Sequence, residues 1–180
     1  MGRSGIMSLK EFEEKEKYIR GAGTTRLQEY EGPELIGEGY HGFVYKISDT
    51  RIAKIAGPYV NLIGREEKIA KKLFEYEISI PEPFGIQNIP IITNLHGVKK
   101  ERIFDAFIME FIPGKTGYEL EEYNHRDFEK SKLLLSRELG RAREKGFDPG
   151  VDGFSLKNYI FTPDKKIKLI DFAMWSFCGS

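Results

Sequence analysis

The chain has 180 residues, of which 40% are hydrophobic and 13% aromatic, enough for one compact domain or two small lobes. This composition excludes a wholly disordered chain. Its 28 Lys and Arg residues balance 28 Asp and Glu residues, which disfavours a nucleic-acid-binding protein because such proteins need a surplus of cations. The single cysteine, Cys178, excludes a disulfide framework, and no apolar run reaches the roughly 18 residues that span a bilayer. We therefore expect a cytoplasmic protein with no nucleic-acid or membrane partner.

The first 30 residues are predicted to form a helical extension. Ser8 and Glu11 make a capping box at the start of residues 8–20, and Glu and Lys or Arg recur four apart along that segment. The pattern then becomes strand-like over residues 35–55 and helical over residues 60–76.

A stretch punctuated by prolines follows, and after it the sequence predicts an apolar strand over residues 104–112. Residues 127–145 have the period of an amphipathic helix, and residues 158–172 read as a terminal hairpin. Strands and helices in this order indicate an α+β fold rather than a parallel doubly wound sheet.

Gly37, Gly39, Gly42 and Val44 fit the pattern G-x-G-x-x-G-x-V, in which glycines let the backbone approach phosphate groups closely. A dinucleotide-binding fold needs a helix directly after these glycines. Here residues 43–47 continue as a strand, so the glycines are expected to join two antiparallel strands, as in a kinase-type loop.

Lys54 lies in an otherwise apolar strand, and Glu66 falls at the middle of the apolar stripe of the next helix. A carboxylate on a buried face is costly unless a cation meets it, so the sequence predicts that Lys54 pairs with Glu66. Two alternatives stay open: Lys54 extends to water from an edge strand, or the helix rolls so that Glu66 reaches water.

Asn158 and Asp171 stand at the two open ends of the terminal hairpin. An amide oxygen and a carboxylate placed there can bind one hard cation such as Mg²⁺. The alternative is that Asn158 caps a loop and Asp171 caps a turn.

Taken together, these segments resemble eukaryotic-like protein kinases, and the small RIO-type and archaeal-style kinases most of all. The likeness covers residues 35–175 and rests on segments that occur in the family's order: GEGYHGFVYK, RIAKIA, REEKIAKKL, FIMEFIPG, FSLKNYIF and LIDFA. It implies a kinase-like fold with an antiparallel N-lobe sheet and one C-helix over residues 31–113, and a reduced C-lobe over residues 114–180.

The resemblance also implies ATP and Mg²⁺ as cofactors. Lys54 would bind the α- and β-phosphates and pair with Glu66, while Asn158 and Asp171 would hold Mg²⁺. Two further groups are carried over: the loop over the phosphates, with Gly37, Glu38, Gly39, Gly42 and Val44, and the adenine-binding segment, with Met109, Glu110 and Ile112.

Two features depart from the family pattern. The position of the catalytic base, five residues before Asn158, is Gly153, and Asp152 comes one residue early. We expect a bulge to bring the Asp152 carboxylate into place; otherwise Asp152 is an ordinary turn residue. Only a short segment follows Asp171, so the helices that dock peptide substrates are expected to be absent.

The function expected from the resemblance is a minimal ATP-dependent phosphotransferase that acts on Ser or Thr of a protein substrate. The alternative is a pseudokinase, an ATP-binding module that regulates a protein partner without phosphoryl transfer. A small-molecule kinase ranks last, because the sequence contains no obvious acceptor-binding insert.

Overall fold

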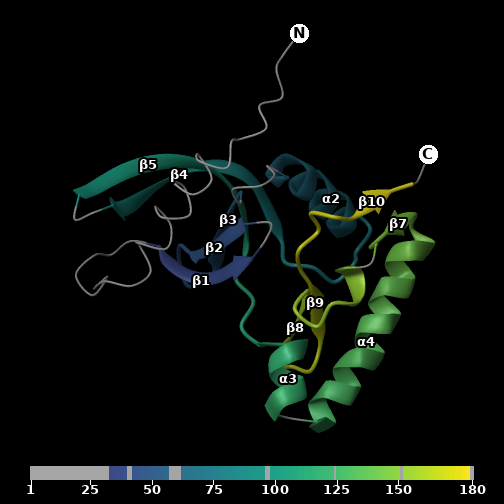
Figure 1. Cartoon of the computed structure of the whole chain (residues 1–180). Helices are drawn as coiled ribbons and strands as arrows, with labels where there is room; N and C mark the ends of the chain where they lie inside the picture. Colours follow the sequence, from purple (N-terminus) through teal and green to yellow (C-terminus); the bar gives the residue numbers. More distant parts are fainter. Residues whose placement is uncertain are drawn as a thin grey trace. The chain divides into compact units, whose positions relative to one another are not determined.

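The computed structural model describes residues 33–39, 42–56, 62–95, 98–123, 125–150 and 152–178. The predicted helix over residues 8–20 and the extension over residues 1–30 lie outside them. The described elements form an α+β fold, as expected (Figure 1). In chain order they are β1 (Glu34–Gly39), β2 (Gly42–Lys46), β3 (Arg51–Ala56), α2 (Ile63–Glu75), β4 (Pro83–Leu95), β5 (Val98–Glu110), β6 (Lys115–Thr116), α3 (Gly117–Tyr123), α4 (His125–Glu144), β7 (Phe147–Asp148), η1 (Asp152–Phe154), β8 (Tyr159–Phe161), β9 (Ile167–Leu169) and β10 (Ser176–Phe177).

The chain divides into two compact units. The first comprises Met1–Ile63 and Ile86–Ile108, and the second comprises Gly64–Gly85 and Met109–Ser180. The lobe boundary predicted after Pro113 lies close to Met109, where the chain enters the second unit for the last time. The division into lobes at residues 31–113 and 114–180 stays a prediction.

A five-stranded sheet in the order β1-β2-β3-β5-β4 dominates the first unit. β2 pairs antiparallel with both β1 and β3. Phe43 lies opposite Ile55 and Tyr45 lies opposite Ala53, and all four side chains are buried. The alternation of apolar residues along these strands thus becomes one shared core face.

β4 occupies the segment that prolines punctuate, where the sequence analysis expected no strand. It begins at Pro83 and contains Pro90. Because β4 is an edge strand, the N–H groups that its prolines lack are not needed for pairing on its outer side. The prolines therefore mark an edge strand here rather than a loop.

In the second unit, α2 ends in a Schellman motif. The Glu77 N–H donates to the Phe74 carbonyl and the Ile78 N–H donates to the Leu73 carbonyl, each at 3.0 Å. Glu77 takes the left-handed conformation (φ 57°) that usually belongs to glycine at this position. A non-glycine residue is costly there, so the surrounding contacts must hold this turn in place.

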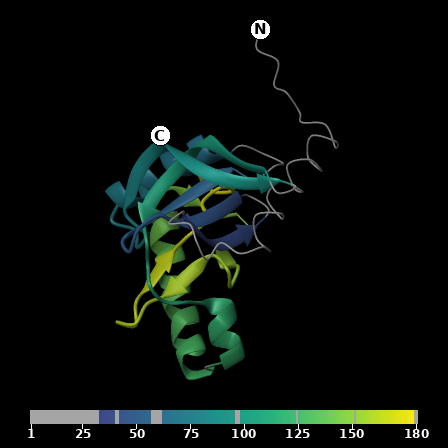
Figure 2. The same ribbon diagram turned by 90° about the vertical axis from the view of Figure 1, so that its left-hand side faces the viewer.

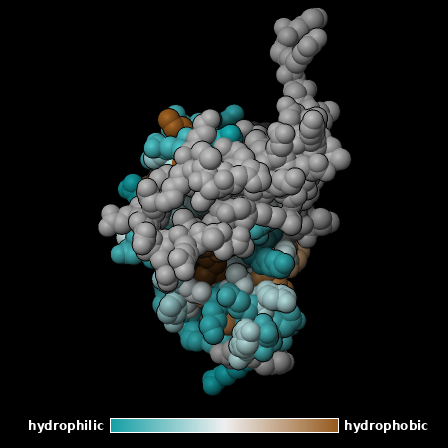
Figure 3. Space-filling model, turned by 60° about the vertical axis from the view of Figure 1, so that its left-hand side comes forward, coloured by the Kyte–Doolittle hydropathy of each residue, from teal (hydrophilic) through white to brown (hydrophobic). Residues whose placement is uncertain are grey.

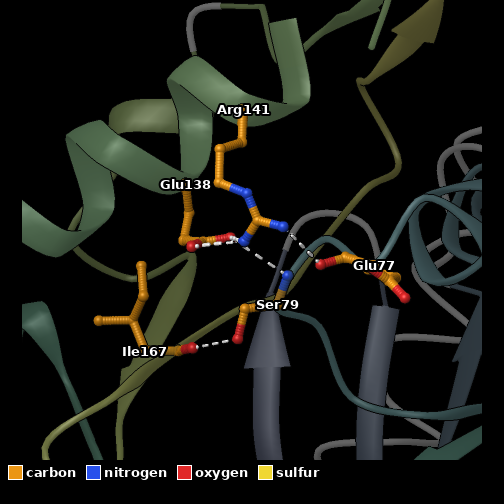
Figure 4. A network of polar contacts seen from close by, with 5 residues as sticks. All are labelled: Glu77, Ser79, Glu138, Arg141 and Ile167. Atoms are coloured by element: carbon orange, nitrogen blue, oxygen red, sulfur yellow. Dashed lines mark hydrogen bonds and ion pairs between the residues drawn. The ribbon is translucent and has the colours of Figure 1, made fainter. Parts of the chain in front are cut away.

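A polar network holds the turn after α2 against α4 and β9 (Figure 4). Arg141 Nη2 donates to the Glu77 carbonyl at 3.1 Å, while Arg141 Nη1 lies 3.0 Å from both Glu138 oxygens. Glu138 accepts the Ser79 N–H at 3.3 Å, and the Ser79 hydroxyl donates to the Ile167 carbonyl at 2.6 Å. Three segments distant in sequence are therefore joined at one place.

α3 and α4 lie side by side as a helical hairpin (Figures 1 and 2). Thr116 and Glu119 cap α3 reciprocally: Glu119 accepts the Thr116 N–H at 2.7 Å, and the Thr116 hydroxyl accepts the Glu119 N–H at 3.3 Å. The apolar stripe predicted for α4 is confirmed, since its four members are all buried: Phe128, Leu135, Leu139 and Ala142.

Tyr159 on β8 fits closely against this helical hairpin. Its hydroxyl lies 2.9 Å from the buried Ser131 hydroxyl, and burial raises the pKa of the Tyr159 phenol above its ordinary value. Gly117 packs on the same ring so closely that a Cβ at position 117 would overlap it.

The described surface is largely hydrophilic on the face shown in Figure 3, with hydrophobic residues in small patches. Among the described residues, no helix is both long and apolar enough to cross a membrane.

Two glycine substitutions test the close packing of α3 on β8. Gly117→Ala should lower the free energy of unfolding by about 1–3 kcal/mol, because its methyl group overlaps the Tyr159 ring. Gly140→Ala is the matched control, since a Cβ at position 140 meets nothing within 4 Å, and alanine should raise helix stability by about 0.5–1 kcal/mol. Urea denaturation measures both, and equal effects would contradict this packing.

Candidate functional site

Asn158 and Asp171 lie at the same end of the β8–β9 hairpin. β8 and β9 pair antiparallel with Tyr159 opposite Leu169, and the Ile170 N–H donates to the Asn158 carbonyl at 2.9 Å. Asn158 thus immediately precedes β8, while Asp171 follows β9 on the adjacent strand. The structure confirms that these two residues are brought together, as the hairpin pattern predicted.

Asp171 has a left-handed backbone conformation, with φ at 62°. Aspartate tolerates this region better than most residues, but the conformation still costs free energy outside glycine. Such strained residues persist where their surroundings hold them, and they cluster at functional sites.

Glu66, in the first turn of α2, is 1% exposed, which confirms its predicted place on the buried face. The alternative in which the helix rolls to bring Glu66 to water is therefore wrong. One Glu66 carboxylate oxygen accepts the Phe172 N–H at 3.2 Å. This hydrogen bond fixes α2 to the residue directly after Asp171.

The glycine pattern lies where β1 and β2 meet, in the first unit. Gly39 pairs with Gly42 and Glu38 with Phe43 in an antiparallel ladder, while residues 40–41 lie outside the described part of the chain. Because the glycines join two antiparallel strands, the strand–loop–helix of a dinucleotide-binding site is not formed here. Gly37 lies close to Val44, because a Cβ atom added at position 37 would be 3.5 Å from the Val44 Cβ.

Lys54 lies on β3, opposite Val44 on β2, and is 6% exposed. β3 is flanked by β2 and β5, so the alternative in which Lys54 reaches water from an edge strand is wrong. Lys54 belongs to the first unit and Glu66 to the second. Their pairing stays a prediction.

The residues expected to contact adenine lie at the end of β5 and just after it, where the chain enters the second unit. Met109 and Ile112 are buried, at 5% and 8% exposed. The Glu110 N–H donates to the Glu82 carbonyl at 2.9 Å, and the Glu110 carboxylate accepts the Glu82 N–H at 3.2 Å. These two bonds fix the backbone at position 110, and the adenine-binding role of the segment stays a prediction.

Gly153, at the position where the resemblance to protein kinases predicts a catalytic base, has no room for a side chain. It lies in η1, its N–H donates to the Pro149 carbonyl at 3.2 Å, and a Cβ there would overlap the Pro149 ring. Asp148 is a turn residue, since its carboxylate accepts the Gly150 N–H at 3.0 Å. Asp152 starts η1, and its assignment as the base stays a prediction.

The donor set at the end of the β8–β9 hairpin fits Mg²⁺. Among the described residues, no cluster of three or more His, Cys, Asp or Glu side chains is placed to hold a metal. Mg²⁺ is commonly bound through one or two protein oxygen ligands together with substrate phosphates rather than by a full protein cage. Asn158 and Asp171 provide a pair of that kind.

Comparisons with known proteins support the fold. No protein-family model matches the chain, and no curated protein matches its sequence. Its structure is similar to that of WbdD, solved as a co-crystal with the kinase inhibitor LY294002, with a TM-score of 0.50 at 12% identity. The match covers 78% of this chain and 32% of WbdD, so the chain spans about a third of that protein's length. This likeness shows a kinase-like fold.

Replacing Glu66 tests how much its hydrogen bond to Phe172 stabilises the protein. Glu66→Ala leaves the buried Phe172 N–H without its carboxylate partner. The free energy of unfolding, measured by urea denaturation, should therefore fall by about 1–3 kcal/mol. Glu75→Ala, on the exposed face of the same helix, should change stability by less than about 0.5 kcal/mol. A loss no larger than the Glu75→Ala loss would argue against a stabilising Glu66–Phe172 bond.

Proposed function

We propose that the chain is a minimal ATP-dependent phosphotransferase that transfers the γ-phosphate to Ser or Thr of a protein substrate. The observation that carries the proposal is the pair Asn158 and Asp171 at one end of a hairpin, with Asp171 in a left-handed conformation. The kinase-like fold supports the same reading. The buried Glu66 carboxylate, fixed to Phe172, adds the element that would position a phosphate-binding lysine.

In this proposal each predicted residue has one task. Asn158 and Asp171 hold Mg²⁺, which when bound neutralises charge on the phosphates. Lys54 binds the α- and β-phosphates, and its ammonium is oriented by Glu66. The backbone around Gly37, Glu38, Gly39, Gly42 and Val44 covers the phosphates, and adenine contacts Met109, Glu110 and Ile112.

The transfer step requires a base near the acceptor. The acceptor hydroxyl oxygen forms a bond to the γ-phosphorus while the bond from that phosphorus to the β–γ bridging oxygen breaks, and ADP leaves. Asp152 takes the hydroxyl proton.

A pseudokinase is the second candidate, favoured by the packing of Gly153 on Pro149. With no room for a carboxylate at the usual base position, the chain would bind ATP and regulate a protein partner without transferring phosphate. Transfer of phosphate to a protein separates the two candidates, because only the first includes it.

Three substitutions test the proposed site in a γ-phosphate transfer assay with a generic protein acceptor. Lys54→Ala and Asp171→Asn should each reduce transfer by at least about 100-fold, because each removes a charge that positions or neutralises the phosphates. Asp152→Asn should reduce transfer by about 100-fold or more while ATP affinity stays unchanged, as expected for loss of a general base.

The outcomes distinguish the candidates. Transfer that does not depend on Lys54 and Asp171 would overturn the proposed site. Full transfer in Asp152→Asn would overturn only the assignment of the base. Mg²⁺-dependent ATP binding by the wild type, with no transfer to any protein, would favour the pseudokinase.

A further inference from the structure

Two consecutive residues of α2 hold the segment that follows β9. Arg65 Nη2 donates to the Trp175 carbonyl at 3.0 Å, and Glu66 accepts the Phe172 N–H at 3.2 Å. Both contacts lie within the second unit. The start of α2 is thus bonded to both ends of the stretch Phe172–Trp175.

This stretch is a tight turn whose side chains are buried except that of Met174. The Trp175 N–H donates to the Phe172 carbonyl at 3.1 Å, and the two rings pack edge to face with centroids 5.4 Å apart. Phe172 and Trp175 are each 1% exposed, and Ala173 between them is fully buried. The turn is therefore tied to the start of α2 at both of its ends.

The indole of Trp175 gains no hydrogen bond from its burial. Its Nε1 is buried, and no partner for it occurs among the described residues. A buried donor without a partner is unfavourable, and burial of the apolar surface of the indole offsets that cost. The polar contact of Trp175 with α2 is made through its backbone carbonyl, the atom that Arg65 binds.

Asp171 directly precedes this turn and has the left-handed conformation described above. Holding Phe172 and Trp175 from α2 restricts the backbone on the carboxyl side of Asp171, while the bond from Ile170 to Asn158 restricts it on the amino side. The backbone on both sides of Asp171 is therefore held by hydrogen bonds, and Arg65 makes one of those on the carboxyl side.

We propose that Arg65 is a positioning residue for the metal-binding conformation of Asp171, acting through Trp175. The inference rests on the proposed function, because it assigns Asp171 to Mg²⁺. Its consequence is that the start of α2 and the metal site are coupled. Binding of MgATP should change the environment of Trp175. Replacing Arg65 should reduce the amount by which Mg²⁺ raises ATP affinity.

The chain carries its own probe, because Trp175 is its only tryptophan. The experiment titrates the full chain with ATP, with and without Mg²⁺, and records Trp175 fluorescence together with calorimetric affinity. The test variant is Arg65→Met. The matched control is Lys68→Met, which removes the same charge from an exposed position on the same helix. If Arg65→Met does not fold, Arg65→Lys takes its place, since it keeps the charge but loses the planar donor group.

In the wild type, Mg²⁺ should raise ATP affinity and change Trp175 emission. In Arg65→Met, this gain from Mg²⁺ should fall about tenfold, as expected for loss of a charge-assisted hydrogen bond, and the emission change should be lost. ATP affinity without Mg²⁺ should stay at the wild-type value, which a general loss of structure would not allow. Lys68→Met should behave as the wild type does.

Arg65→Met with an unchanged gain from Mg²⁺ would overturn this inference and leave the proposed function standing. So would an equal loss in Lys68→Met, because charge alone would then explain it. A wild type that binds ATP equally well with and without Mg²⁺, or not at all, would overturn the proposed function and the inference with it.

Discussion

The Glu66 carboxylate is buried on α2 and accepts the backbone N–H of Phe172. An ionised carboxylate withdrawn from water is costly, and the N–H groups at the start of a helix offset only part of that cost. The remaining cost is met by groups brought to it through folding, and Phe172 provides one of them. This contact makes the position of α2 and the path of the chain after Asp171 depend on each other, and the candidate site is built on that dependence.

The carboxyl end of α2 is also held by hydrogen bonds. Its Schellman motif puts Glu77 in a conformation that normally belongs to glycine, and Arg141 binds the Glu77 carbonyl from α4. The same network continues through Ser79 to β9, the strand that leads to Asp171. α2 is therefore bonded at its start to the turn after β9, and just beyond its end to β9 itself. Residues at both ends of α2 are thus bonded to the segments on either side of Asp171.

Some elements were missed although their signals are present in the sequence. α3 was not expected, yet Thr116 and Glu119 have the spacing of a capping box and form one in the structure. β4 was not predicted, because prolines disfavour a central strand, although an edge strand tolerates them. Whether a strand lies at an edge depends on strand order, and strand order is a property of the whole sheet.

The sequence by itself determined the α+β class, the buried face of α2 with Glu66 on it, and the common end of the hairpin for Asn158 and Asp171. It could do so because helical and strand periodicities record burial within a few residues of each position. Only the tertiary structure decided that Gly153 has no room beside Pro149, that Asp171 is left-handed, and that Arg65 binds Trp175. The last contact joins residues 110 positions apart, and no local pattern records which backbone carbonyl a distant arginine will meet.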